Sequence, residues 1–148
     1  EEATQQTFLD DGWLRTGDLG YFDDENYLFI KGRSKNVIVG PSGENIYPEI
    51  VEQELMKSAY VAECVVYQNE GKLIALAYLD YDAVDEYVNG ETSGTKEEEK
   101  TLELLDIVRK ETNMNLPQFA SINKIIEHPE PFEKTPTNKV KRYLYLPR

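Results

Sequence analysis

The 148-residue sequence is poor in the side chains that form cross-links and metal sites. With one cysteine, Cys64, it cannot form an internal disulfide, and with one histidine, His128, it lacks the usual clusters of zinc ligands. Neither residue has a partner at a suggestive spacing. We therefore expect packing or surface roles for both, no bound metal, and a reducing, cytoplasmic setting.

Long apolar runs and targeting signals are also missing. No run approaches the ~18 consecutive apolar residues that a membrane-spanning helix needs. Residues 1–13 have neither the basic start nor the apolar run of a signal peptide, and the chain does not begin with methionine. We expect a soluble piece of a longer protein, with peripheral contact as the one remaining link to a membrane.

Basic side chains are outnumbered by acidic ones. The chain has 28 Asp and Glu against 16 Lys and Arg, and its net charge of −12 repels a phosphodiester backbone, which argues against nucleic-acid binding. Residues 134–148, KTPTNKVKRYLYLPR, are the exception, because they include basic side chains and no acid. We call this segment the basic tail. With 40% hydrophobic residues, the chain can build one ordinary core.

Turn formers and apolar spacing predict an α+β fold in which helices flank a small mixed or antiparallel sheet. A β-hairpin is expected within residues 19–32, where aromatic segments surround a cluster of turn formers, and a second short pair flanks GPSG at 40–43. A helix is predicted over 48–58, because it begins with proline and places Val51 and Leu55 on one face.

The second half of the predicted sheet comes from two adjacent apolar segments and one distant segment. Segments 61–68 and 73–80 are separated by NEGK, which predicts antiparallel strands joined by a tight turn. Residues 121–128 are the last strand candidate. Residues 129–139 contain three prolines and no periodicity, so a loop is expected there.

An acidic stretch separates these strands. A flexible connection is predicted at 89–94, and an amphipathic helix within 96–113, where Asp106 can pair with Lys110 one turn later. Residues 91–100, ETSGTKEEEK, have the Ser, Thr, Gly and Lys of a phosphate-binding loop, but three glutamates follow and a solvated loop is expected. The apolar residues that repeat at helical spacing in this helix are Leu102, Leu105 and Val108.

Three segments contain residues suited to binding or catalysis. In RTGDLG (15–20), the Asp18 carboxylate can accept hydrogen bonds from two neighbouring hydroxyls, as on a ribose, or it can merely cap the turn into the hairpin. The cations of KGRSKN (31–36) and of the basic tail can equally be solvated surface charge. Taken singly, none of these segments identifies a function.

Their order and spacing are more specific. The segment GWLRTGDLGYFDDENYLFIKGRSKNVIVGPSGENIYPEIVEQEL, followed by EPFEKTPTNKVKRYL, resembles the end of AMP-forming acyl-CoA synthetases, which belong to the adenylate-forming superfamily. The likeness spans residues 12–144, and the residues of these segments are most similar to those of long-chain fatty acid CoA ligases. Two positions depart from the common pattern: Asn138 stands where many relatives have glycine, and Asn45 where many have arginine.

The resemblance implies roles for five residues. Asp18 would hold the ribose hydroxyls of ATP, and Arg33 would reach the same nucleotide. Lys35 matches the hinge about which the small C-terminal domain rotates between two half-reactions. Gly43 would pass close to the pantetheine arm of CoA, where a side chain would block it. Lys139 matches the lysine that acts in acyl-AMP formation, and we expect the other cations of the basic tail, Lys134, Lys141 and Arg142, to attract the polyphosphate.

The resemblance also implies a division of the chain. Residues 1–33 would be the trailing edge of a larger N-terminal adenylation domain, residues 34–148 the mobile C-terminal domain, and 34–36 the hinge. The parent enzyme would use ATP, a fatty acid and CoA, with Mg held mainly by the larger domain, and the chain alone would be inactive. The N-terminal domain is thus the expected protein partner.

Two other functions fit the same residues. The first, in the same superfamily, is an acyl-AMP ligase that loads the phosphopantetheine of a carrier protein instead of CoA. The second is a non-catalytic acidic interaction module whose partner surface is residues 80–106. It predicts that the parent protein does not respond to ATP.

Overall fold

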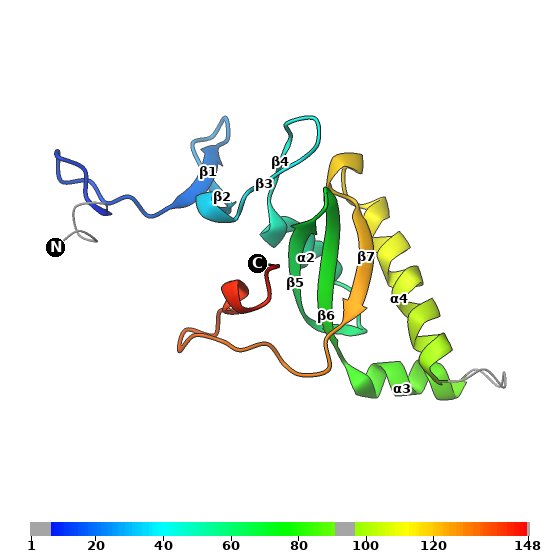
Figure 1. The fold of residues 1–148 in the computed structure, drawn as a ribbon. Helices are drawn as coiled ribbons and strands as arrows, with labels where there is room; N and C mark the ends of the chain where they lie inside the picture. The colour runs from blue at the N-terminus through cyan, green and yellow to red at the C-terminus, as the bar shows by residue number, and fades with distance from the viewer. Residues whose placement is uncertain (1–6, 91–96, 148) are drawn as a thin grey trace.

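A three-stranded sheet forms the centre of the fold in the computed structural model, which describes residues 7–90 and 97–147 (Figure 1). Its strands are β5 (Val61–Asn69), β6 (Lys72–Leu79) and β7 (Ile122–Glu127), in the spatial order β5-β6-β7. β5 and β6 are antiparallel, as predicted, whereas β7 pairs with β6 in parallel. The expected α+β class with a small mixed sheet is confirmed.

Two helices cover one face of this sheet. Helix α2 (Pro48–Leu55) packs against β5, α4 (Glu97–Met114) packs against β7, and the two helices also touch each other. Val51 and Leu55 of α2 are buried, as their spacing predicted, and α2 ends three residues before the expected boundary. The buried apolar residues that form this core include Val51, Leu55, Cys64, Val66, Ala75, Ala77, Leu104, Leu105, Val108 and Ile125.

The buried face of α4 differs from the predicted one at one position. Leu105 and Val108 are buried, but the Leu102 side chain is 66% exposed, and Leu104 takes its place in the core. The prediction was wrong at Leu102 because the buried stripe is centred on residues four apart, Leu104 and Val108, and Leu102 lies on the far side of that line. The predicted pair of Asp106 with Lys110 is present, with 2.7 Å between Lys110 Nζ and Asp106 Oδ2.

Truncating the centre of this core should destabilise the domain. Leu55 is 0% exposed, so Leu55→Ala should lower the free energy of unfolding of the 148-residue chain by about 3 kcal/mol through lost apolar burial and the cavity left behind. Met114, which is 82% exposed, provides the control, because Met114→Ala should change the free energy of unfolding by less than about 0.5 kcal/mol. Urea unfolding followed by circular dichroism measures both, and equal losses would contradict this description of the core.

Helix α3 (Tyr81–Gly90) was not predicted. It begins where the sequence turns strongly acidic, and Asp80 caps it: the Ala83 N–H donates to Asp80 Oδ1 at 3.2 Å. Val84 and Val88, one turn apart, are buried in the core. Of the flexible connection predicted at 89–94, the first two residues belong to α3, and residues 91–94 lie outside the described part of the chain.

Two short antiparallel pairs precede the central sheet, as predicted. β1 (Asp18–Phe22) pairs with β2 (Leu28–Arg33), and the 3₁₀ turn η1 (Ser34–Asn36) connects this hairpin to β3 (Ile38–Val39) and β4 (Asn45–Ile46). The β1–β2 hairpin projects from the side of the sheet away from α4 (Figure 1). Many of its large apolar side chains are exposed, among them Tyr21, Phe22, Tyr27, Leu28 and Ile30.

The chain after β7 runs along the β5 side of the sheet (Figure 1). The His128 N–H donates to the Ala77 carbonyl at 2.8 Å, and the His128 ring stacks on Phe132 with 4.7 Å between centroids. The ring of Tyr145 packs edge-on against both, so the basic tail is held to the domain by an aromatic cluster. Two 3₁₀ turns complete the described elements: η2 (Gln118–Ala120) before β7 and η3 (Arg142–Leu144) within the tail.

Candidate functional site

Asp18 and Arg33, the two residues expected at the nucleotide, are direct neighbours. They face each other across β1 and β2, and Arg33 Nε lies 3.1 Å from Asp18 Oδ1. Arg33 Nη1 also donates to the Thr16 carbonyl at 2.7 Å, so the guanidinium holds the turn and the carboxylate together. Both side chains are partly exposed, 34% for Asp18 and 44% for Arg33, so their contact with each other is not buried. This arrangement presents an oriented carboxylate to solvent.

Lys35, the predicted hinge residue, is exposed in the middle of η1. Contacts on both sides of it define the turn: the Ser34 N–H donates to the Gly17 carbonyl at 2.8 Å, and Asn36 Nδ2 donates to Glu49 Oε1 of α2 at 2.6 Å. A Cβ atom on Gly32 would come within 2.7 Å of Glu49 Oε2, so glycine leaves room for this contact. The turn is thus held from both sides, by the hairpin and by α2.

Gly43 lies in the turn between β3 and β4. Its N–H donates to the Gly40 carbonyl at 3.0 Å and its φ is +88°, a conformation that favours glycine. A Cβ atom built on Gly43 would meet nothing within 4 Å. Within this chain, glycine is required at this position by backbone conformation and not by a close neighbour.

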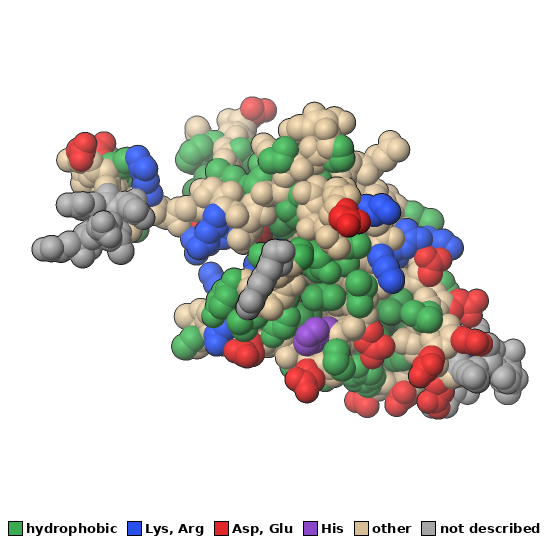
Figure 2. Space-filling view, viewed as in Figure 1, with side chains coloured by type: hydrophobic (Ala, Val, Ile, Leu, Met, Phe, Trp, Pro, Cys, Tyr) green, Lys and Arg blue, Asp and Glu red, His purple; other side chains and the backbone are tan. Residues whose placement is uncertain are grey.

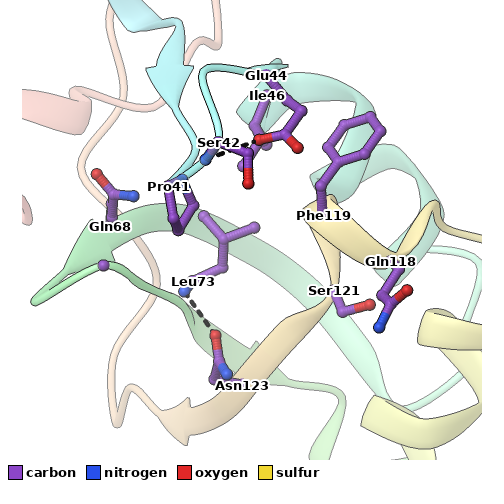
Figure 3. A pocket seen from close by; sticks show the side chains of 11 residues that line it. Pro41, Ser42, Glu44, Ile46, Gln68, Leu73, Gln118, Phe119, Ser121 and Asn123 are labelled. Atoms are coloured by element: carbon purple, nitrogen blue, oxygen red, sulfur yellow. Dashed lines mark hydrogen bonds between the residues drawn. The ribbon is translucent and has the colours of Figure 1, made fainter.

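A pocket of about 480 Å³ opens beside this turn (Figure 3). Pro41, Ser42 and Glu44 of the turn form one side, and residues of η2 and β7 form the other. Two hydrogen bonds shape its walls, from the Ser42 N–H to Glu44 Oε2 at 3.2 Å and from the Leu73 N–H to Asn123 Oδ1 at 2.8 Å. No lysine or arginine lines it, so it provides no counter-charge for a phosphate. The complete lining is Pro41, Ser42, Glu44, Ile46, Gln68, Gly71, Leu73, Gln118, Phe119, Ser121 and Asn123.

Lys139, the predicted catalytic residue, lies in a small hairpin where a plain loop was expected. Residues 134–140, which we call the lysine hairpin, are closed by a bridge between Lys134 and Val140. The Asn138 N–H donates to the Thr135 carbonyl at 2.9 Å, and the Thr135 N–H donates to the Lys139 carbonyl at 2.8 Å. Asn138 has a φ of +60°. The turn needs a left-handed residue there, and asparagine adopts that conformation more readily than most residues.

The cations around Lys139 are paired within the domain. Lys134 binds Glu63, Arg142 binds Glu52, and Lys141 Nζ lies 3.0 Å from Glu133 Oε2. The expected attraction of polyphosphate by these three side chains is therefore weakened, because each charge already has a carboxylate partner. Among the described residues Lys139 makes no ion pair, and its side chain is exposed.

Charge is unevenly distributed over the surface. Figure 2 shows acidic side chains gathered over α3 and the start of α4. The exposed acids there include Asp82, Asp85, Glu86, Glu97, Glu98 and Glu99. An anion therefore meets strong repulsion at this end of the fold.

Burial changes the acidity of two groups beneath the basic tail. Desolvation raises the pKa of Glu52, while the Arg142 guanidinium and the Val66 N–H oppose that rise. Desolvation likewise raises the pKa of the Cys64 thiol, whose Sγ lies 3.6 Å from the Glu52 carbonyl oxygen. Cys64 is thus an inert packing residue, as expected, and His128 packs within its aromatic cluster.

Four of the five predicted site residues fall into two groups, and Gly43 lies apart in the β3–β4 turn. Asp18 and Arg33 are brought together, with Lys35 directly after them, whereas no hydrogen bond or ion pair between described residues joins Lys139 to either. Figure 1 shows the two hairpins projecting separately on the side of the sheet away from α4. Sequence reasoning missed the glutamates that bind the tail, because their partners are far along the chain.

Two kinds of feature are absent from the described residues. Residues 7–90 and 97–147 contain no helix with the length and apolarity to cross a membrane. The same residues contain no group of three or more His, Cys, Asp or Glu side chains that could hold a metal ion.

Two known proteins that are similar to this chain are both named as CoA ligases. The chain is 33% identical over 155 residues to the long-chain-fatty-acid–CoA ligase FadD15 of Mycobacterium tuberculosis, a match that covers 96% of this chain and 26% of that protein. It is 47% identical over 66 residues to a 2-succinylbenzoate–CoA ligase of Bacillus cytotoxicus, covering 45% of this chain and 13% of that one.

Solved structures agree. The o-succinylbenzoate CoA synthetase of Bacillus subtilis in complex with its acyl-adenylate intermediate superposes with a TM-score of 0.67 at 27% identity, covering 100% of this chain and 27% of that one. No family model matches. The chain thus spans about a quarter or less of the length of these relatives.

Proposed function

We propose a function from the premise that this chain belongs to the adenylate-forming superfamily, as the C-terminal domain of an AMP-forming acyl-CoA ligase. The parent enzyme first joins a long-chain fatty acid to AMP and then transfers the acyl group to CoA. The observation that supports this best is Lys139, which is exposed and makes no ion pair among the described residues, whereas the neighbouring cations Lys134, Lys141 and Arg142 are each paired.

In the first half-reaction, a fatty carboxylate oxygen attacks the α-phosphorus of ATP and pyrophosphate leaves. Negative charge from both reactants then converges on one small volume. The Lys139 ammonium, a compact charge with three donors, lowers this repulsion and stabilises the transition state. Because it is not held by a carboxylate of its own domain, it can move to the reactants without breaking a contact.

Asp18 and Arg33 bind the nucleotide in this proposal. Arg33 Nε holds Asp18 Oδ1, which orients the carboxylate so that Oδ2 accepts hydrogen bonds from the ribose hydroxyls. Arg33 keeps Nη2 for the nucleotide, because its described contacts use Nε and Nη1. Mg, which accompanies ATP, is assigned to the larger domain.

The second half-reaction needs a different arrangement. The CoA thiol attacks the acyl carbon and AMP leaves, so Lys139 must give up its place near the phosphate. A rotation about Lys35 removes it and brings the β3–β4 turn with Gly43 toward the thiol. In this division, residues 1–33 belong to the larger domain. The exposed apolar side chains of the β1–β2 hairpin, such as Phe22 at 66%, support it, because a two-stranded hairpin alone is marginally stable and such side chains are usually covered.

Long-chain acids are proposed as substrates because the FadD15 match covers 96% of this chain. The 2-succinylbenzoate–CoA ligase match has the higher identity but covers 45%. Incubating the full-length parent with ATP and palmitate should release pyrophosphate and form palmitoyl-AMP, and adding CoA should give the thioester. Turnover of 2-succinylbenzoate but not palmitate would overturn the long-chain assignment, and transfer to a carrier protein but not to CoA would overturn the acceptor.

The 148-residue chain alone should form no acyl-CoA and should bind ATP weakly, because one carboxylate and a few cations cannot replace a nucleotide pocket. Isothermal titration with ATP and a thioester assay on the purified chain measure this, with the full-length parent as the positive control. Turnover by the isolated chain, free of contaminating ligase, would contradict the two-domain proposal.

A further inference from the structure

Both legs of the lysine hairpin are fastened to strand β5 by charged contacts. On the leg that enters the hairpin, Glu63 of β5 binds two groups at once: its Oε2 accepts the Phe132 N–H at 3.1 Å, and its Oε1 pairs with the Lys134 ammonium. The side chains are only partly accessible, 19% for Glu63 and 31% for Lys134. A partly buried, charge-assisted contact of this kind is stronger than an exposed ion pair.

On the leg that leaves the hairpin, Arg142 makes the second fastening. Its Nη1 pairs with Glu52 of α2, and its Nη2 donates to the Val66 carbonyl of β5 at 2.7 Å. Glu52 Oε1 also accepts the Val66 N–H at 2.6 Å, so the three groups form a closed network. Arg142 and Glu52 are 17% and 12% exposed. Removing one partner would leave a nearly buried charge uncompensated.

The two fastenings limit how the hairpin can move. Lys134 opens the hairpin and Arg142 follows its end, so the contacts enclose Lys139. The Lys141 N–H donates to the Glu133 carbonyl at 2.8 Å and continues the ladder between the legs. Because the contacts end on β5 and on α2, which pack together, tilting the hairpin relative to the sheet breaks at least one of them. The position of the Lys139 backbone is thus set by β5 and α2.

We propose that Glu63 and the Glu52–Arg142 pair are positioning residues that hold Lys139 in place for acyl-AMP formation, an inference that rests on the proposed function. They touch neither substrate in this scheme. They fix the hairpin, and the pairing of Lys134 with Glu63 and of Arg142 with Glu52 keeps these two cations from competing with Lys139 for the phosphate. A purely structural role would affect both half-reactions, whereas a positioning role affects the step in which Lys139 takes part.

Glu63→Gln in the full-length parent tests this directly. Glutamine keeps an acceptor for the Phe132 N–H but removes the charge that holds Lys134. The rate of acyl-AMP formation should fall roughly tenfold, because the transition state of that step loses stabilisation. The rate of conversion of supplied acyl-AMP and CoA to the thioester should stay unchanged. Glu133→Gln is the matched control: it removes the same charge from the Lys141 pair, where Glu133 is 64% exposed, and should change either rate less than about twofold.

A double-mutant comparison shows whether Glu63 acts through Lys139. In a Lys139→Ala background, Glu63→Gln should cause no further loss of acyl-AMP formation. Arg142→Lys, which keeps the charge but not the two-pronged contact, should reproduce the selective loss, with the melting temperature measured for each variant. Additive losses, or equal losses in both half-reactions, would overturn the positioning role and leave the proposed function of Lys139 standing. If Lys139→Ala itself left adenylation intact, the proposed function would fail and this inference with it.

Discussion

Lys139→Ala in the full-length parent should slow acyl-AMP formation by roughly a hundredfold or more, the loss expected when one preorganised charge donor is removed from a transition state. Synthesis of the thioester from supplied acyl-AMP and CoA should be largely spared, because Lys139 is rotated away in that step. Pyrophosphate release measures the first half-reaction, and chromatography of the thioester measures the second.

Lys141→Ala is the control for this result. Lys141 lies two residues from Lys139 but is paired with Glu133, so its loss should change adenylation only slightly, through screened long-range attraction. The structure strengthens this expectation, because the pair leaves little net charge at that position. Comparable damage from both substitutions would show that Lys139 has no special role and that the basic tail acts as a diffuse charge.

Lys35→Pro should separate the two half-reactions by roughly a hundredfold, the order of loss associated with a small misplacement of catalytic groups. Proline fixes φ at position 35 and disfavours the helical conformation of Ser34, which lies in the same 3₁₀ turn. One domain orientation should therefore become harder to reach than the other. Separate assays of acyl-AMP and thioester formation measure the difference.

Lys35→Ala controls for the side chain, because it keeps the backbone freedom of the turn and should leave the ratio of the two rates near that of the unaltered enzyme. An equal loss in both half-reactions of the proline variant would place the pivot elsewhere. Retained rates in both would show that rotation at this residue is not required.

Much of the fold could be predicted because the signals were local. The β1–β2 hairpin, the β5–β6 turn and the proline at the start of α2 each depend on residues within a few positions of one another. Helix α3 had such a signal too: Asp80 before it is a capping residue, and Val84 and Val88 are one turn apart. No element was predicted for residues 81–88, and the flexible connection predicted at 89–94 included the last two residues of the helix.

Other features could not be read from local patterns. The parallel pairing of β7 with β6 matches Leu73 to Ile122, and no rule of spacing gives that register. In the candidate site, Asp18 and Arg33 were identified from the resemblance, but the contacts of the basic tail were not. Glu52 and Arg142 are 90 positions apart, and Glu63 and Lys134 are 71 apart. Only the packed fold shows that these charges neutralise one another.

The Glu52–Arg142 pair also bears on solubility. β5 is an edge strand of the sheet, and the N–H and carbonyl groups of Val66 are bound by these two side chains. An uncovered strand edge is a template for pairing with another molecule. The pair occupies this edge at Val66, so a variant without Arg142 is expected to leave one backbone acceptor open to pairing with another molecule.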